Sequence, residues 1–207
     1  MGKLVLLIWH WFPTKTKRLQ SFSDIELWNA SHQGDRAAFG ELFRRHYSML
    51  YQYGSKICTE KEVLEDSIQE LFVELWQKKP SIALHSVKAY LLQALKFKLY
   101  KTFRNKKRIA NYELGIHEVF EISHENFLIH EQENREKIEK ILDALNMLPT
   151  RQKEVIYLKI YKGLSYEEVS EVMQLNYQVV RNLLCQALKT FRKLVVPCFI
   201  IVSALGG

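Results

Sequence analysis

The sequence predicts an all-α protein made of two small helical domains that an acidic linker joins. Its 207 residues are 47% apolar but include only eight glycines and four prolines, and a shortage of these two helix-breaking residues favours helices. Apolar residues recur at helical spacing along most of the chain, and charged residues are gathered in blocks. A chain of this length can bury one core or two small ones.

The charge blocks divide the chain. Six acids face one lysine from Glu60 to Trp76, whereas eight basic residues and no acid lie from Ser86 to Arg108. The stretch from Asn111 to Asn134 has six glutamates, no lysine or arginine and weak periodicity, which is typical of a linker. We therefore expect an N-terminal tail (1–20), a first domain (21–110), the linker (111–134), a second domain (135–196) and an apolar tail (197–207).

The first domain is predicted to hold four helices. Ser23 and Glu26 form a capping box that opens a short helix, and Asp35 can cap the next. Two apolar stripes at helical spacing follow, and Lys79-Pro80-Ser81 ends the second of these helices. The last helix runs from Ser86 to Arg108. The stripe residues are Phe39, Leu42, Phe43, His46, Tyr47 and Leu50, then Leu64, Ile68, Leu71, Phe72 and Leu75.

The second domain is predicted to begin with two amphipathic helices. The first carries apolar residues from Ile138 to Leu148 and is closed by Pro149. The second runs from Thr150 to Tyr161 and stops at Gly163.

A helix-turn-helix is predicted after these two helices. Ser165 and Glu168 form a second capping box, and Asn176 can cap the helix that begins at Tyr177. The two helices are joined by the three-residue turn 174–176, which is the length this motif uses. Val169 and Val172 on the first helix can pack against the second, and Leu175 can fill the turn.

Polar side chains are left on the outer face of the last helix. Gln, Asn and Arg can make bidentate contacts with base edges, and a helix fits the major groove of DNA. The alternative is an ordinary helical hairpin with a solvated polar face. The candidate DNA-reading residues are Tyr177, Gln178, Arg181, Asn182, Gln186 and Lys189.

The basic helix at 86–108 is a second candidate site. Phe97, Tyr100 and Phe103 recur among its cations. These rings can be core residues, or they can stack on exposed bases while the cations bind phosphates. The absence of acids favours a nucleic-acid role, because a merely solvated face usually mixes charges of both signs.

The acidic helix at 60–76 is a third candidate. Its apolar stripe is expected to pack inside, while Asp66, Gln69, Glu70 and Glu74 lie elsewhere on the helix. A solvated face is one interpretation of these residues, and a docking surface for a basic protein is the other.

No motif for catalysis or cofactor binding is found. The chain has no Gly-rich phosphate loop, no H-E-x-x-H and no G-x-S-x-G. Its three cysteines are scattered, which argues against a disulfide framework and a zinc site and indicates a reducing compartment. We predict no enzyme, no cofactor and no metal, and the net charge of +7 favours an anionic partner.

Four stretches in order resemble the extracytoplasmic-function group of bacterial sigma factors. They are "GDRAAFGELFRRHY" (34–47), "EDSIQELFVELW" (65–76), "LPTRQKEVIYL" (148–158) and "GLSYEEVSEVM" (163–173). The resemblance covers about residues 22–108 and 135–194. It implies a helical-bundle sigma region 2, a helix-turn-helix sigma region 4, and an alternative sigma factor that acts in the cytoplasm.

The resemblance also implies partners and sites. Core RNA polymerase is bound at its β′ clamp and β flap, with Asp66, Gln69, Glu70 and Glu74 on the clamp side, and promoter DNA is bound both melted and as duplex. The linker threads toward the polymerase active site, and an anti-sigma factor is a further partner that the family allows. The loop 79–85 and the following helix melt the −10 element, whose expected contacts are Lys88, Tyr90, Gln93, Lys96, Arg104, Lys106, Lys107 and Arg108. The second domain reads the −35 element.

Two positions depart from the family pattern. Phe97 and Lys101 stand where Asn and Asp are common in the −10 helix, which leaves the −10 preference open. Gln174 stands where the helix-turn-helix usually has Gly, so the turn must be held by a residue that is strained there.

Two other functions compete with the sigma-factor interpretation. A stand-alone helix-turn-helix transcription regulator would bind duplex without polymerase. A membrane-surface protein would use the basic helix and the apolar ends, 4–12 and 194–207. The N-terminal segment has no small-residue cleavage site, so we expect a mis-assigned start or a disordered tail rather than a signal peptide. The C-terminal segment is too short to span a bilayer.

Overall fold

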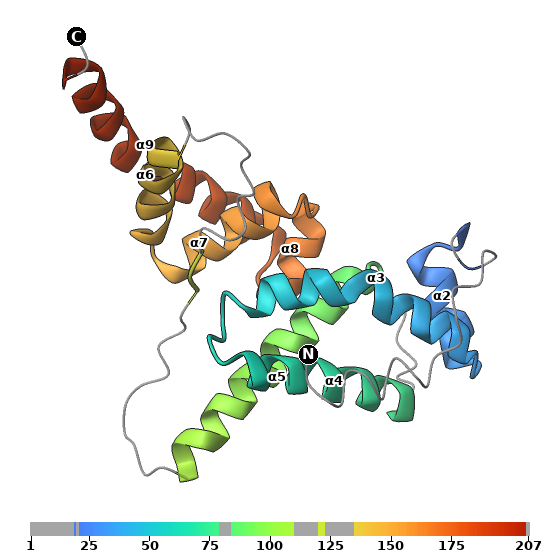
Figure 1. The fold of residues 1–207 in the computed structure, drawn as a ribbon. Helices are drawn as coiled ribbons and strands as arrows, with labels where there is room; N and C mark the ends of the chain where they lie inside the picture. The colour runs from blue at the N-terminus through green and yellow to red at the C-terminus, as the bar shows by residue number, and fades with distance from the viewer. Residues whose placement is uncertain (1–18, 20, 79–83, 110–119, 123–134, 206–207) are drawn as a thin grey trace. The chain divides into compact units, whose positions relative to one another are not determined.

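The computed structural model describes residues 19, 21–78, 84–109, 120–122 and 135–205, without the side chains of 106–109, 135–138 and 196–205. The expected N-terminal tail, the helix end at Lys79–Ser81 and most of the expected linker lie outside these ranges. Every element in the described ranges is a helix, which confirms the all-α class. The chain forms two compact units, Met1–His117 and Glu118–Gly207 (Figure 1).

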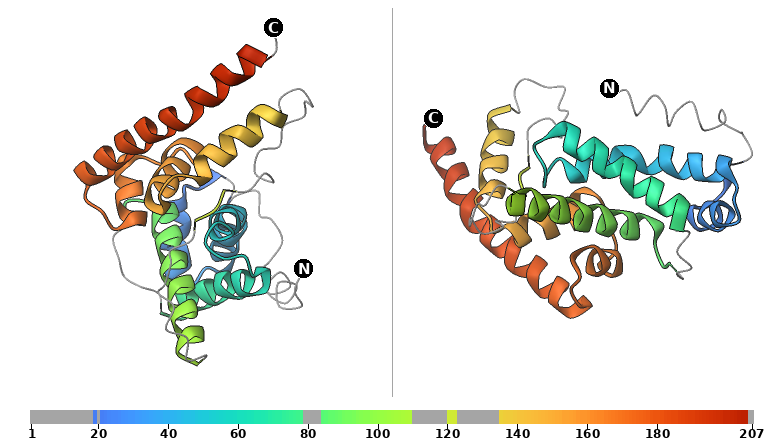
Figure 2. Two further views of the ribbon diagram at one scale, coloured as in Figure 1. Left: turned by 90° about the vertical axis from the view of Figure 1, so that its left-hand side faces the viewer. Right: turned by 90° about the horizontal axis from the view of Figure 1, so that it is seen from below.

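The first unit contains four described helices. They are α2 (Asp24–His32), α3 (Arg36–Gly54), α4 (Lys61–Lys78) and α5 (Val87–Ile109). Helices α3, α4 and α5 pack on one another (Figures 1 and 2), and α2 packs on α3 and α5. The predicted caps are confirmed, because Ser23 and Glu26 form the capping box and Asp35 Oδ1 accepts hydrogen bonds from the first backbone amides of α3.

The core of the first unit is built from the predicted stripes together with leucines of α5. Leu50, Leu64, Ile68 and Leu95 are buried to 1% exposure or less. At the end of α3, Gly54 lets two of these leucines, Leu64 and Leu95, approach the backbone, and a Cβ at this position would clash with Leu64. The close approach of the three helices therefore depends on a residue without a side chain.

A polar cluster fastens the start of α2 to α3. Arg45 donates hydrogen bonds to the carbonyl oxygens of Leu19 and Phe22, and it pairs with Asp24 at 3.1 Å. His46 is buried beside it, with Nε2 3.0 Å from Asp24 Oδ2. Burial lowers the pKa of His46, although Asp24 acts in the opposite direction.

The second unit contains α6 (Arg135–Asn146), α7 (Thr150–Ile156), η4 (Tyr157–Tyr161), α8 (Tyr166–Met173) and α9 (Tyr177–Leu205). The helix predicted over 150–161 is thus an α-helix followed by a π-helical turn. Lys162 N–H donates to Tyr157 O at 2.9 Å, five residues back, and the rings of Tyr157 and Tyr161 stack with centroids 5.2 Å apart.

The helix-turn-helix forms as predicted from α8 and α9. Ser165 and Glu168 make the capping box, and Asn176 Oδ1 accepts from Val179 N–H at 2.8 Å. Val169 and Val180 are fully buried between the helices. Gln174 has φ 53° and is the one non-glycine residue with positive φ in the described part of the chain.

Helix α9 does not end before the expected apolar tail. Its backbone stays helical to Leu205 and passes through Pro197 (Figure 1). No helix in the described ranges is both long enough and apolar enough to cross a membrane.

We expect Gln174→Gly to stabilise the second unit. A non-glycine residue in the left-handed region costs about 1–2 kcal/mol, and the larger backbone entropy of glycine offsets about 0.5–1 kcal/mol of that relief. Denaturant unfolding should give a net gain of roughly 0.5–1 kcal/mol. Gln174→Ala is the matched control, since it removes the side chain and keeps the strain. Equal stability of both variants would contradict this account.

Candidate functional site

The acidic face of α4 is only partly as expected. Asp66, Glu70 and Glu74 are exposed, but Gln69 is buried to 6% exposure. The side chain of Gln69 is therefore not part of the exposed surface, although the sequence grouped it with the three acids. Val73 is 45% exposed and lies one turn from both Glu70 and Gln69 along the helix. The face thus combines three carboxylates with an exposed apolar residue that sequence reasoning missed.

Lys98 of α5 is bound to this acidic face. Its Nζ lies 3.1 Å from Glu70 Oε2 and 2.6 Å from Glu74 Oε1, and Lys78 pairs with Glu74 at 3.2 Å. Hydrogen bonds from Lys98 and then Lys78 lower the pKa of Glu74. Burial on its own would lower the pKa of Lys98, but the carboxylates of Glu74 and Glu70 raise it by more. The pKa of Lys98 therefore lies above its ordinary value. Asp66 has no ion pair within the described residues.

Of the eight predicted contacts on the basic helix α5, five have described side chains, and only one of these five, Arg104, is exposed. Lys88 is half-buried and close enough to His46 for its charge to lower the pKa of that imidazole. Tyr90 packs edge-on against Trp28 with centroids 5.4 Å apart, and burial raises its pKa. Gln93 and Lys96 are half-buried and Arg104 is exposed, while the side chains of Lys106, Lys107 and Arg108 lie outside the described residues.

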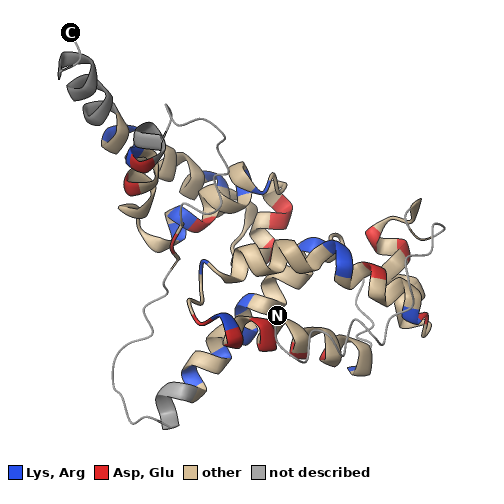
Figure 3. Cartoon of the chain, in the orientation of Figure 1, with Lys and Arg blue, Asp and Glu red and all other residues tan. Residues whose placement is uncertain are grey.

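One ring of α5 faces solvent. Phe97 is 66% exposed, whereas Tyr100 and Phe103 are half-buried. Phe97 borders a groove of about 270 Å³ between α4 and α5, with Leu71 and Leu75 in its floor and Lys98 and Lys101 at its edge. Basic residues follow α5 along its length (Figure 3). The interpretation as core residues thus does not fit Phe97, whose exposed ring is the one available for base stacking.

Helix α9 keeps all six of the predicted DNA-reading residues exposed. Tyr177, Gln178, Arg181, Asn182, Gln186 and Lys189 lie in the first four turns of α9. Gln178 Nε2 donates to Asn182 Oδ1 at 3.1 Å, and the Arg181 guanidinium lies 5.9 Å from the Tyr177 ring centroid. The buried side is formed by Val180, Leu184 and Ala187. The described part of α9 therefore presents amide and guanidinium groups on one side and apolar groups on the other.

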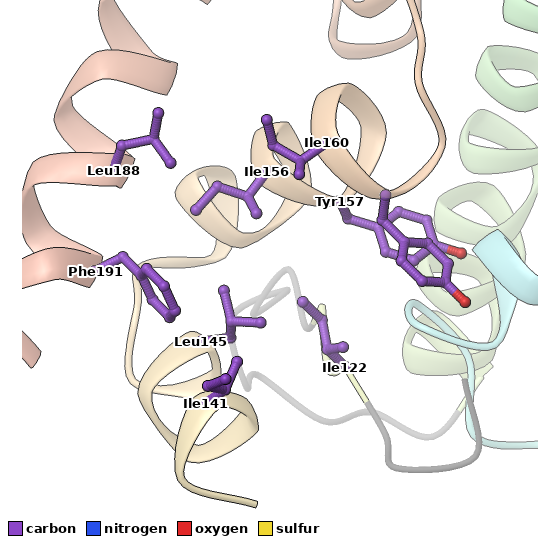
Figure 4. A pocket seen from close by; sticks show the side chains of 9 residues that line it. Ile122, Ile141, Leu145, Ile156, Tyr157, Ile160, Leu188 and Phe191 are labelled. Carbon is purple, nitrogen blue, oxygen red and sulfur yellow. The ribbon is translucent and has the colours of Figure 1, made fainter. Parts of the chain in front are cut away.

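The second unit also has an apolar groove of about 400 Å³. Figure 4 shows its side chains converging from α6, α7, η4 and α9, together with Ile122 from the expected linker. Ile160 is 61% exposed and Leu188 43% exposed at its border. The lining residues are Ile122, Ile141, Leu145, Ile156, Tyr157, Ile160, Tyr161, Leu188 and Phe191.

Part of the expected linker is packed on the second unit. Phe120 and Ile122 are 2% and 4% exposed, and the Phe120 ring meets the Tyr157 ring edge-on at 5.5 Å. Glu121 between them is exposed, and the remaining expected linker residues, His117, His124 and His130 among them, lie outside the described ranges. No group of His, Cys, Asp or Glu that could hold a metal ion is present among the described residues.

Two family models match the chain. One, described as Sigma-70 region 2, matches residues 42–109, and the other, described as Sigma-70, region 4, matches residues 138–191. Together they cover more than half of the chain, with one match in each compact unit.

Curated relatives are similar over most of their length. The ECF RNA polymerase sigma factor SigK of Mycobacterium tuberculosis is 22% identical over 165 residues, which cover 76% of this chain and 86% of SigK. The ECF RNA polymerase sigma-E factor of Haemophilus influenzae is 23% identical over 190 residues, covering 86% and 98%.

Two solved structures share the fold. CnrH, in complex with the cytosolic domain of CnrY, has a TM-score of 0.56 and 20% identity, with 83% of this chain and 96% of CnrH covered. RpoE of Bartonella quintana, in complex with the anti-sigma factor NepR, has a TM-score of 0.55 and 22% identity, with coverage of 76% and 96%.

We expect Phe97→Ala to leave the stability of the first unit within about 0.5 kcal/mol, because the ring is exposed. Leu95→Ala, two residues earlier on the buried side, should lower the free energy of unfolding by about 2–5 kcal/mol. Urea unfolding followed by circular dichroism measures both. A loss above about 1 kcal/mol for Phe97→Ala would mean that the ring is a core residue in solution.

Proposed function

The chain belongs to the sigma-70 family and is a promoter-directing sigma factor of the extracytoplasmic-function group, and from that premise we propose how its two units divide the work. The first unit docks on core RNA polymerase and holds the melted −10 element. The second unit reads the −35 element as duplex. The observation that carries this proposal is the capped helix-turn-helix whose six predicted reading residues are all exposed on α9.

Docking is assigned to the exposed face of α4 that faces the β′ clamp in the family. Asp66 and Glu70 supply negative charge, and Val73 supplies an apolar contact between polar neighbours. Such a combination suits a partner with basic and apolar side chains, because charge steers the encounter and the apolar contact is buried on binding. Gln69 is left out of this surface since it is buried.

The −10 contacts are assigned to the exposed side of α5. Lys101 and Arg104 can bind phosphates, and Phe97 offers a free ring face on which a base can stack. Lys106, Lys107 and Arg108 and the loop 79–83 belong to the same proposal on the basis of the sequence alone. Lys88 and Tyr90 are not included, because Lys88 is half-buried and Tyr90 packs edge-on against Trp28.

The apolar groove of the second unit suits an amphipathic helix from a protein partner. Its lining is aliphatic and aromatic, and Ile160 and Leu188 extend it onto the surface. We assign it to the β flap of polymerase. An anti-sigma factor is a second proposed ligand of this chain, by analogy with the partners named for CnrH and RpoE. A protein with these partners acts in the cytoplasm and catalyses no reaction itself.

Transcription in vitro tests the docking surface. Core polymerase without sigma and a pool of promoter fragments should give discrete new start sites when the native chain is added. Asp66→Arg should lower the affinity for core polymerase by tenfold or more, about 1.4 kcal/mol, without breaking an ion pair of the described residues. Asp143→Arg on the exposed side of α6 is the charge-matched control and should leave the affinity unchanged.

Two results would contradict the docking proposal. Equal affinities of the Asp66→Arg and Asp143→Arg variants would remove α4 from the interface. Duplex binding without polymerase, and no transcripts, would favour a stand-alone helix-turn-helix regulator.

Arg181→Ala should relax selection at one base pair of the −35 element by about 1–3 kcal/mol if the guanidinium contacts a base edge. Lys189→Ala, eight residues further along α9, is the comparison. It should weaken binding of all sequences alike and lower the salt slope by about 0.9, as loss of one phosphate contact does. Binding to a set of single-base −35 variants at several salt concentrations separates the two roles. Unchanged selection in Arg181→Ala would reject it as a reader.

A further inference from the structure

We propose that Tyr166 is a positioning residue for −35 recognition. Its ring holds the ring of Tyr177, and Tyr177 in turn limits the directions in which the Arg181 guanidinium can point. Tyr166 is half-buried and lies in the helix before the one that reads the DNA, so its effect on base selectivity is exerted through Arg181. This inference rests on the proposed function of the second unit, in which Arg181 reads a base edge.

The two tyrosines join the starts of the two helices of the helix-turn-helix. Tyr166 is the first residue of α8, and Tyr177 is the first residue of α9. Their ring centroids lie 5.5 Å apart with the ring planes at 60°, an edge-to-face arrangement. Aromatic pairs favour this geometry, because the positive edge of one ring meets the negative face of the other. The contact therefore restrains the ring of Tyr177, which is 42% exposed, from the side of α8.

Tyr177 in turn contacts the guanidinium of Arg181. Arg181 comes four residues later and so lies on the same side of α9, and its Cζ is 5.9 Å from the Tyr177 ring centroid. A cation within about 6 Å of a ring centroid is attracted to the ring. Among the described side chains, no carboxylate is paired with Arg181. The contact with the Tyr177 ring is therefore the interaction that can order this guanidinium before DNA is bound.

Tyr166 is itself held by a cation. Lys159 Nζ lies over its ring, 4.4 Å from the centroid, and donates a hydrogen bond to Leu164 O at 2.8 Å. Lys159 is half-buried and belongs to the π-helical turn η4. Its ammonium group thus contacts both the Tyr166 ring and the backbone just before α8. The position of Tyr166 is therefore set by contacts inside the second unit.

An ordered guanidinium favours base selectivity in particular. A bidentate contact with a base edge needs two N–H donors to meet two acceptors in one plane, whereas a phosphate contact carries no sequence information. A side chain that is ordered before binding also loses less entropy when it binds. Loosening Arg181 should therefore reduce discrimination at its base pair more than it reduces binding to DNA as a whole.

Binding of the polymerase holoenzyme to promoter fragments that differ at single −35 positions tests this role. Tyr166→Leu keeps an apolar side chain and removes the ring, while Tyr166→Phe keeps the ring and is the matched control. Tyr166→Leu should lower selectivity roughly two- to fivefold at the base pair that Arg181→Ala relaxes. This range corresponds to an exposed cation–π contact of about 0.5–1 kcal/mol. Selection at other positions should not change, and Tyr166→Phe should behave as native.

A double variant separates positioning from folding. In the Arg181→Ala background, Tyr166→Leu should have no further effect on selectivity at that base pair, because the side chain through which it acts is gone. A merely structural role would weaken binding to all −35 fragments alike in both backgrounds. Such uniform weakening would overturn the proposal, and so would native selectivity in Tyr166→Leu.

Nuclear magnetic resonance of the full-length chain tests the ring contacts without DNA. The side-chain resonances of Arg181 should differ between the native chain and Tyr177→Leu, because an aromatic ring shifts the resonances of nearby protons. Tyr166→Leu should reproduce part of that shift, and Tyr166→Phe should not. Identical Arg181 resonances in Tyr166→Leu and the native chain would reject the positioning role. Unchanged −35 selection in Arg181→Ala would instead reject the proposed reading function of Arg181, and with it the role of Tyr166 in recognition.

Discussion

Burial of one face of each helix in its own unit is the constraint on which every candidate surface depends. Helix α4 places Ile68 and Leu75 inside, which turns Asp66 and Glu70 outward. Helix α9 buries Val180 and so presents Arg181 and Asn182. Since neighbouring residues differ by about 100° around a helix, the core decides which polar residue meets a partner. The functional surfaces are therefore products of packing as much as of composition.

Ion pairs change the charge of the surfaces that packing leaves exposed. The first unit has an acidic helix beside a basic one, and Lys98 joins them through Glu70 and Glu74. Those two carboxylates are paired with Lys98, whereas Asp66 has no ion pair among the described side chains. Lys98 is 14% exposed in these pairs, whereas Glu70 and Glu74 are 67% and 48% exposed, so the two carboxylates stay accessible to a docking protein. On the proposed docking face, the paired carboxylates of Glu70 and Glu74 thus lie toward the C-terminal end of α4 and Asp66 lies one turn before them.

The sequence predicted the parts of the structure that local signals determine. Capping boxes at Ser23 and Ser165 and the stripe on α4 act within a few residues, and each formed as expected. Three features could not be read from such signals. Gln69 sits at the margin of its stripe, where a small rotation decides burial. Phe97 lies about 200° around α5 from the buried Leu95, although its spacing grouped it with Tyr100 and Phe103. The Asn146 side-chain amide is hydrogen-bonded to the backbone of Ile122, 24 residues away, and no periodicity connects two such residues.

Because the His46 imidazole beside Asp24 is buried, the first unit loses stability in acid. Burial lowers the pKa of His46, whereas the unfolded chain binds a proton near the ordinary value of about 6.5. The unfolded state therefore takes up more protons as the pH falls below that value, and the free energy of unfolding declines with it. Above about 6.5 the imidazole is neutral in both states and its contribution is constant. At neutral pH the polar attachment of α2 to α3 therefore combines the Arg45–Asp24 ion pair with an uncharged His46 beside the same carboxylate.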